Sequence, residues 1–200
     1  KETLDLLASV PEVEDIDIVA HSRGSDVAAT ALRELVIRER GRGVRPKITL
    51  KTGPLVLAAP DLDVGIGRQR LMSERVFAAF EQVNVYLNPG DQALAIASIL
   101  TREARFGRLD ASDFAPGELA ALKKVGLVHF IRVEGAGGAG HSYFRDNPGA
   151  MSDIALALRT RAFPGGTLRP LERDHDNIWT LHPDYPLERL PDLDLDYVQD

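Results

Sequence analysis

The chain contains the stretch Asp15-Ile16-Asp17-Ile18-Val19-Ala20-His21-Ser22-Arg23-Gly24-Ser25. A short apolar run stops just before Ser22, and a segment with the periodicity of an amphipathic helix begins just beyond Gly24. A serine on a sharp turn between a strand and a helix is held outward, where it can attack a substrate; this is the logic of the nucleophile elbow. The stretch therefore predicts a serine hydrolase, and the rest of the chain must supply a histidine and a carboxylate in the right order.

The five residues around this serine depart from the usual pattern. A nucleophile elbow is normally Gly-x-Ser-x-Gly, because the turn needs small residues on both sides of the serine. Here Ala20 takes the place of the first glycine, and alanine is the least bulky substitute. The alternative interpretation is a helix N-cap, in which Ser22 or Ser25 accepts hydrogen bonds from backbone amides.

Composition narrows the class of protein. A length of 200 residues suits one domain, and 44% hydrophobic residues is ordinary for a globular core. No apolar run approaches the roughly 18 residues that would predict a membrane span. The absence of cysteine excludes disulfides, thiolate metal sites and cysteine nucleophiles. We expect a soluble protein and leave its compartment open, with the cytoplasm as the default expectation.

The charge is unevenly distributed along the chain. The net charge is −6, and residues 171–200 alone carry −7. Neither part has the concentrated positive charge that nucleic-acid binding needs, so we expect no nucleic-acid partner.

Strand-like and helix-like segments alternate along the chain. Short apolar runs without polar alternation predict buried parallel strands at residues 16–20, 55–59, 83–87 and 127–133. Helical periodicity lies between and after them, at residues 26–40, 68–82, 92–100, 118–124 and 152–161. This alternation predicts an α/β fold with a mostly parallel sheet flanked by helices. Functional residues of such sheets lie just beyond the carboxyl ends of strands.

Two residues meet that positional requirement. Asp91 follows the strand at residues 83–87 through the turn Asn88-Pro89-Gly90, and His141 ends the glycine-rich loop after the strand at residues 127–133. The order Ser22, Asp91, His141 is the order of nucleophile, acid and base in α/β hydrolases. The three residues agree with a catalytic triad in residue type, in order along the chain and in position after a strand. This agreement favours a triad over helix caps and turns.

Four segments together resemble a known family. They are Ile18-Val19-Ala20-His21-Ser22-Arg23-Gly24, Leu57-Ala58-Ala59-Pro60-Asp61-Leu62-Asp63, Val85-Tyr86-Leu87-Asn88-Pro89-Gly90-Asp91-Gln92-Ala93-Leu94 and His141-Ser142-Tyr143-Phe144. The chain resembles the α/β-hydrolase superfamily and, within it, the family catalogued as domain of unknown function 900, over about Leu4 to Arg161. The resemblance implies a serine-hydrolase fold and triad but no established substrate.

The chemistry assigns a role to each candidate. Ser22 would attack the carbonyl of an ester, thioester or amide, His141 would take its proton, and Asp91 would hold the imidazole. The backbone N–H of Arg23 would be one oxyanion donor. His21 would support the turn or line the substrate site. We expect a small-molecule ester or acyl substrate, no cofactor and no metal.

One feature departs from the family pattern. The nucleophile strand normally has several strands before it, whereas residues 16–20 form the first predicted strand here and would leave an unpaired edge. The second oxyanion donor normally comes from a loop after one of those earlier strands. We therefore expect an N-terminal half of the fold, upstream or as a separate chain, and leave open an oligomer. On this interpretation residues 1–162 are the C-terminal portion of an α/β-hydrolase catalytic domain.

The last segment has a different composition. Residues 163–200 are rich in proline and acidic residues and show little helical periodicity. We predict an extended acidic C-terminal tail that wraps the domain, with Ile178, Trp179, Leu181 and Tyr185 available for docking. A partner-binding arm is the alternative.

Several residues compete for functional roles. Asp61 or Asp63 could replace Asp91 as the acid, with a turn or N-cap as the ordinary alternative. His129 lies inside a predicted strand and is expected to be a hydrogen-bonded core residue. His175 and His182 lie among acidic residues but lack regular metal-ligand spacing.

Two apparent motifs and one basic patch are not interpreted as functional sites. Residues 192–196 begin like an EF-hand loop, but Tyr197 occupies the required glycine position. Residues 135–140 contain Gly-x-Gly-x-x-Gly, yet the loop does not open directly into a helix and no strand is predicted after residues 152–161. Arg102, Arg105 and Arg108 predict a solvated basic patch, with an anionic substrate group as the alternative. A non-catalytic hydrolase-fold scaffold is the alternative to an enzyme.

Overall fold

A computed structural model describes residues 1–114, 116–136 and 140–187. Its centre is a sheet with the strand order β1-β2-β3-β4-β6-β5. The strands are β1 (Ile16–His21), β2 (Thr52–Ala58), β3 (Val83–Leu87), β4 (Val128–Val133), β5 (Glu172–His175) and β6 (Ile178–Leu181). Neighbouring strands from β1 to β6 pair in parallel, and β5 pairs antiparallel with β6. The parallel strands therefore end at a common edge, where functional residues are expected.

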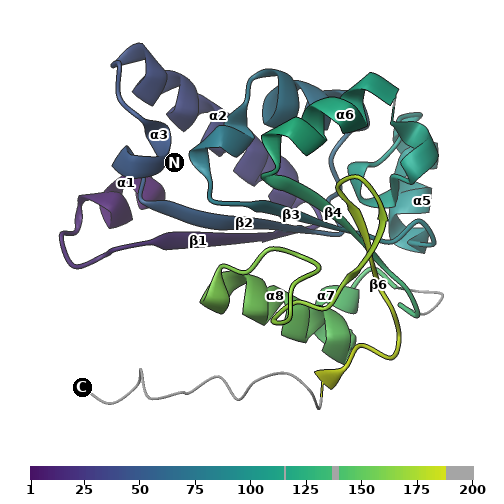
Figure 1. The fold of residues 1–200 in the computed structure, drawn as a ribbon. Helices are drawn as coiled ribbons and strands as arrows, with labels where there is room; N and C mark the ends of the chain where they lie inside the picture. The colour runs from purple at the N-terminus through teal and green to yellow at the C-terminus, as the bar shows by residue number, and fades with distance from the viewer. Residues whose placement is uncertain (115, 137–139, 188–200) are drawn as a thin grey trace.

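Helices cover both faces of this sheet. The α-helices are α1 (Glu2–Ser9), α2 (Gly24–Gly41), α3 (Pro46–Thr49), α4 (Val64–Gly67), α5 (Gln92–Thr101), α6 (Pro116–Val125), α7 (Tyr143–Asp146) and α8 (Pro148–Thr160). Short helices of other types are η1 (Arg68–Ser73), η2 (Val76–Ala79), η3 (Phe106–Arg108) and η4 (Ala111–Asp113). Figure 1 shows α7 and α8 below the sheet, with α2, α3 and α6 above it.

Successive residues of the buried strands belong to two separate hydrophobic cores, one on each face of the sheet. Leu55 and Leu57 of β2 pack with α2, whereas Val56 between them packs with α8 on the opposite face. Every residue of β2 and β3 is buried, because both faces of these central strands are covered. Continuous apolar runs are the sequence consequence of that arrangement. The predicted α/β class with a mostly parallel sheet flanked by helices is confirmed.

Residues 68–82 differ from the single helix predicted there. A π-helix, η1, and a 3₁₀ helix, η2, are separated by Arg75, whose φ of 56° lies in the left-handed region and stops the helix. The Arg70 guanidinium donates hydrogen bonds to the Asp26 carboxylate (2.8 Å) and the Thr30 hydroxyl (2.6 Å) on α2. The segment therefore contacts α2 from an irregular helix, and periodicity alone does not encode such tertiary contacts.

The segment after α8 also differs from the prediction. β6 follows α8 and pairs in parallel with β4, from Phe130 opposite Ile178 to Val133 opposite Leu181. The expectation that no strand follows this helix is therefore wrong, and residues 172–181 are part of the sheet rather than an extended tail. Three apolar residues and one threonine, between acidic, proline-containing stretches, gave too short a pattern to predict a strand. Residues 188–200, including the EF-hand-like stretch, lie outside the described residues.

β1, the strand that leads to Ser22, lies at one edge of the sheet. Its paired side faces β2, from Ile18 opposite Leu55 to His21 opposite Ala58. The predicted N-terminal half of the fold beside this strand stays a prediction. In the described part of the chain, every helix is too short or too polar to span a lipid bilayer.

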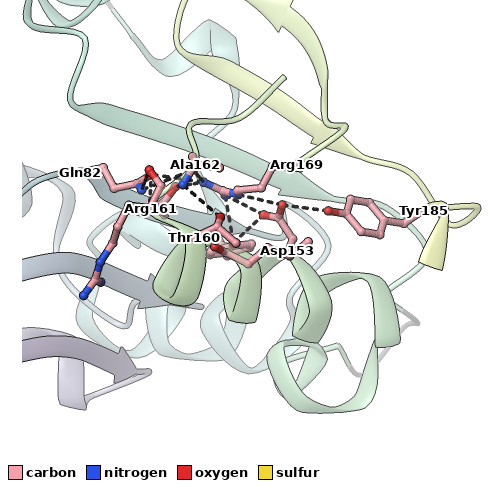
Figure 2. A network of polar contacts seen from close by, with 10 residues as sticks. Gln82, Asp153, Thr160, Arg161, Ala162, Arg169 and Tyr185 are labelled. Carbon is pink, nitrogen blue, oxygen red and sulfur yellow. Dashed lines mark hydrogen bonds and ion pairs between the residues drawn. The ribbon is translucent and has the colours of Figure 1, made fainter. Parts of the chain in front are cut away.

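A buried ion pair joins α8 to the segment that leads into β5. The Asp153 carboxylate accepts hydrogen bonds from Arg169 Nε (3.0 Å) and Nη2 (2.7 Å), and both side chains are fully buried. The hydroxyls of Tyr86 (2.6 Å) and Tyr185 (3.1 Å) donate to the same carboxylate. Figure 2 shows Tyr185 meeting Asp153 on the side away from Gln82. Every oxygen of Asp153 is thus satisfied, which is the condition for keeping a charge in a protein interior.

The Nη1 atom of Arg169 binds the chain just after it leaves α8. Arg169 Nη1 donates to the Ala162 carbonyl (3.0 Å) and to the side-chain oxygens of Gln82 (3.2 Å) and Asn84 (3.1 Å). Gln82 in turn donates to the Arg161 carbonyl (3.1 Å). Carbonyls at a helix C-terminus lack partners within the helix, and side chains from outside satisfy them here.

We expect Asp153→Ala to lower the free energy of unfolding by about 3–5 kcal/mol, because it leaves a buried guanidinium without its counter-ion. Urea denaturation followed by circular dichroism measures this loss. The matched control is Glu34→Ala, which breaks the exposed Lys1–Glu34 pair and should have a far smaller effect. Equal effects of the two substitutions would contradict the assigned role of Asp153.

His129 of β4 differs from the hydrogen-bonded core histidine that was predicted. Its side chain is buried, yet neither ring nitrogen has a hydrogen-bond partner in the described structure. The ring instead meets the aromatic rings of Phe163 and Trp179 edge-on, at centroid distances of 5.3 Å and 6.2 Å. Burial, with smaller contributions from the positive charges of Arg169 and Arg173, lowers the pKa of His129 to about 3.

This buried histidine predicts a pH dependence of stability. The unfolded chain binds a proton on His129 below a pKa of 6.5, whereas the folded chain does so only near pH 3. The free energy of unfolding therefore decreases as the pH falls, by about 2 kcal/mol between pH 7 and pH 5. His129→Leu should remove that part of the acid sensitivity in urea titrations at the two pH values. An unchanged difference between pH 7 and pH 5 in the variant would show that His129 is not its source.

Candidate active site

Ser22 lies on a strained turn between β1 and α2. Its φ of 53° places a non-glycine residue in the left-handed region, as expected for a sharp strand-to-helix turn. Its N–H donates to the Ala58 carbonyl (3.1 Å), and its own carbonyl accepts from the Asp61 N–H (3.2 Å). The end of β2 therefore holds the serine on both sides.

The helix that follows does not use a serine as its cap. Arg23 occupies the N-cap position of α2 and makes no side-chain cap hydrogen bond. Ser25 donates from its hydroxyl to the Ala20 carbonyl (3.4 Å) instead of accepting from an amide. The N-cap interpretation of Ser22 and Ser25 is thus not what the structure shows. Ala20, in the place of the usual glycine, is buried in the core on the α2 face.

Ser22, His141 and Asp91 form one continuous series of hydrogen bonds. His141 Nε2 lies 2.8 Å from Ser22 Oγ, and His141 Nδ1 lies 2.8 Å from Asp91 Oδ2. An ionised carboxylate only accepts, so Nδ1 carries the proton and Nε2 is left to accept from the serine hydroxyl. Three residues that follow three separate strands are therefore joined in the order carboxylate, imidazole, hydroxyl.

Asp91 is held rigidly by the helix it begins. Its Oδ1 accepts from the Leu94 N–H (3.0 Å) and so caps α5, while Oδ2 faces His141. The side chain is fully buried at the N-cap position of α5. The two oxygens are thus divided between holding the helix and orienting the imidazole.

The competing acids lie in other arrangements. Asp61 forms ion pairs with Arg105 (3.3 Å) and Arg23 (3.7 Å), and Asp63 caps α4 through the Ile66 N–H (2.8 Å). Neither carboxylate contacts His141 in the described structure. Arg105, one member of the predicted basic patch, is itself buried and paired.

His21 contacts the backbone of the histidine loop. Its Nε2 lies 3.1 Å from the His141 carbonyl, and its ring faces the rings of His141 and Phe144 at centroid distances of 4.9 Å and 4.2 Å. Burial lowers the pKa of His21, so the ring is neutral at pH 7 and donates through Nε2. A contact between His21 and substrate stays a prediction.

The amide of Arg23 is available beside the nucleophile. Within residues 1–114, 116–136 and 140–187, no group accepts a hydrogen bond from the Arg23 N–H. An amide with no acceptor, directly after the serine, can receive the charge of an oxyanion. The predicted oxyanion donor, the Arg23 N–H, is therefore not engaged in a hydrogen bond within the described residues.

Comparison with known protein families identifies the family of the chain. The family described as "Alpha/beta hydrolase of unknown function (DUF900)" matches residues 1–160. The chain belongs to this family. No curated protein and no solved structure matches the chain. The DUF900 assignment supports a hydrolase fold, whereas the chemistry at Ser22 has to be argued from the site.

Two positions in this DUF900 protein were not predicted as part of the site. Asn88 donates to the Gly140 carbonyl (3.0 Å) and accepts from the Gly90 N–H (3.0 Å), so it links the turn before Asp91 to the loop before His141. Tyr143 is buried two residues beyond the histidine. The sequence showed Asn88 only as a turn residue and Tyr143 only as part of the family resemblance.

The remaining histidines of the DUF900 chain lie elsewhere. His182 contacts the carboxylates of Glu134 (3.0 Å) and Glu172 (2.8 Å), which raise its pKa. His175 lies beside Asp176 (3.3 Å). Of the glycine-rich loop that ends at His141, residues 137–139 lie outside the described structure.

We expect Asp91→Asn to abolish the downfield proton NMR resonance of His141 Nδ1, because a charge-assisted hydrogen bond is replaced by a neutral one. Asp61→Asn is the matched control and should keep the resonance, since Asp61 pairs with arginines instead. Loss of the signal in Asp61→Asn and its retention in Asp91→Asn would reverse the assignment of the acid.

Proposed function

We propose that the chain is a serine hydrolase that acts on carboxylic esters, thioesters or amides through an acyl-enzyme. The observation that carries this proposal is the series Asp91–His141–Ser22, with a distance of 2.8 Å at each step. Membership of an α/β-hydrolase family supports the same class of reaction.

The first half-reaction forms a covalent bond at Ser22. The serine Oγ attacks the substrate carbonyl carbon while its proton moves to His141 Nε2. Asp91 stabilises the resulting imidazolium without taking its proton. The oxyanion of the tetrahedral intermediate accepts from the Arg23 N–H. Collapse of the intermediate breaks the bond to the leaving group, which takes the proton from His141 and departs as an alcohol, thiol or amine.

The second half-reaction releases the acid product. His141 takes a proton from water, and the hydroxide oxygen attacks the acyl carbon on Ser22. The second tetrahedral intermediate expels the serine oxygen, which recovers its proton from His141. Protons and bonds balance over the cycle, with His141 as the group that takes and returns the proton in each half.

A non-catalytic scaffold is the competing function. A scaffold needs no strained serine, no proton relay and no unused amide beside it, yet all three meet at this strand edge. Together they favour catalysis.

We expect a fluorophosphonate probe to label the protein covalently, with one probe per chain on Ser22. Ser22→Ala should abolish labelling, whereas Ser9→Ala, a control in α1 whose hydroxyl bonds only its own helix, should label as wild type does. Intact-mass and peptide spectrometry measure both. Absence of labelling of the folded wild-type protein would support the scaffold.

Asp91→Asn should slow that labelling by about 10³–10⁴-fold, because the imidazole loses the partner that fixes its tautomer. The labelling rate is measured under pseudo-first-order conditions at about pH 7.5. A near-normal rate would remove Asp91 from the mechanism and direct attention to Asp61.

A further inference from the structure

The loop that carries His141 needs external support. It contains Gly135, in the left-handed conformation at φ 67°, and Gly140, and glycine backbone is the least restrained kind. Catalytic side chains must nevertheless be held to within about 0.5 Å of the productive geometry. The contacts of Asn88 with Gly140 and of His21 with the His141 carbonyl hold the chain at the histidine and just before it.

Tyr143 holds the same chain on the other side of the histidine. Its hydroxyl donates to the Tyr86 carbonyl (2.6 Å) and accepts from the Ala59 N–H (3.0 Å). Only 1% of the residue is exposed, and its ring packs in the core on the α8 face. One hydroxyl therefore ties the base-bearing loop to the ends of both β2 and β3.

The two strand ends that it joins also hold the other reacting residues. Ala58, next to Ala59, accepts the Ser22 N–H (3.1 Å), and β3 continues from Tyr86 through Leu87 and Asn88 toward Asp91. Ala59 has a φ of 45°, a strained value for a residue other than glycine. The Tyr143 hydroxyl thus bonds to the end of β2, which holds Ser22, and to the end of β3, which leads to Asp91.

Tyr143 takes no direct part in bond making. Its hydroxyl is occupied as donor and as acceptor, and the side chain does not reach the surface. Burial raises the pKa of Tyr143, so the phenol stays neutral at pH 7. The group is a fixed connection and not an acid or a base.

We propose that Tyr143 is a positioning residue for the proposed hydrolase, whose hydroxyl sets the distance from His141 Nε2 to Ser22 Oγ by fixing the histidine loop to the ends of β2 and β3. The inference rests on the proposed function for its kinetic consequence, but the position of the imidazole can be measured without turnover.

The test compares Tyr143→Phe with Tyr185→Phe in the full chain. Both remove one buried phenolic hydroxyl, but the hydroxyl of Tyr185 donates to the Asp153 carboxylate, whereas that of Tyr143 donates to the Tyr86 carbonyl at the end of β3. Fluorophosphonate inactivation gives the maximal rate and the probe concentration at half that rate. We expect Tyr143→Phe to lower the maximal rate about 10–100-fold with the half-saturating concentration unchanged, since misplacement of about 1 Å has that effect. Tyr185→Phe should leave both values unchanged.

The second readout is the downfield Nδ1 resonance of His141, which needs no reaction. It should broaden or vanish in Tyr143→Phe and persist in Tyr185→Phe. Should Tyr143→Phe not fold, a fluorinated tyrosine at position 143 keeps the ring and hydroxyl but changes the hydroxyl's donor strength, and the resonance should shift.

The outcomes separate the two proposals. If wild type labels at Ser22 and Tyr143→Phe keeps both the wild-type rate and the resonance, the positioning role is overturned and the hydrolase stands. If wild type does not label, the hydrolase fails and the resonance alone decides: its loss in Tyr143→Phe supports positioning, and its retention refutes it.

Discussion

Parallel pairing of β1, β2, β3 and β4 is the constraint on which the site depends. Parallel strands end at one edge, so residues separated by more than a hundred positions in the chain, such as Ser22 and His141, can come within hydrogen-bond distance. Each of the three residues follows a different strand, and none of the strands contributes two. The relay is therefore a consequence of sheet geometry, and any disturbance of strand register would separate its members.

Buried polar contacts connect the stability of the sheet to the geometry of this edge. Tyr86 of β3 has two roles: its hydroxyl donates to Asp153, and its carbonyl accepts from Tyr143. Tyr86 therefore links the ion pair between Asp153 and Arg169 to Tyr143, which holds the histidine loop. A buried ion pair of this kind contributes little net stability, whereas removal of one partner leaves an uncompensated charge and costs about 3–5 kcal/mol.

Much of this arrangement could be predicted from the sequence because its signals are local. The apolar run before Ser22, the turn before Asp91 and the glycine-rich loop before His141 each mark a strand end within a few residues. The order of the three residues then pointed to the triad. Alternation of strands and helices was sufficient for the α/β class.

The parts that escaped prediction depend on contacts between distant residues. β6 has four residues and is recognisable as a strand only because β4 is available to pair with it. The segment at residues 68–82, whose periodicity predicts one regular helix, is interrupted at Arg75 and bonds to α2 through Arg70. In the described structure the ring nitrogens of His129 have no hydrogen-bond partner, and the ring lies against Phe163 and Trp179. Tyr143 bonds to two strand ends that lie far from it in sequence.

The most direct test of the account is to trap the acyl-enzyme. The protein is mixed with an activated ester such as a nitrophenyl acetate, quenched in acid, and analysed by intact-mass and peptide spectrometry. A covalent mechanism at Ser22 predicts the added mass of one acetyl group, located on the peptide that contains this serine. An acetyl group located only on other residues, or none on protein that hydrolyses the ester, would contradict a covalent mechanism at this serine.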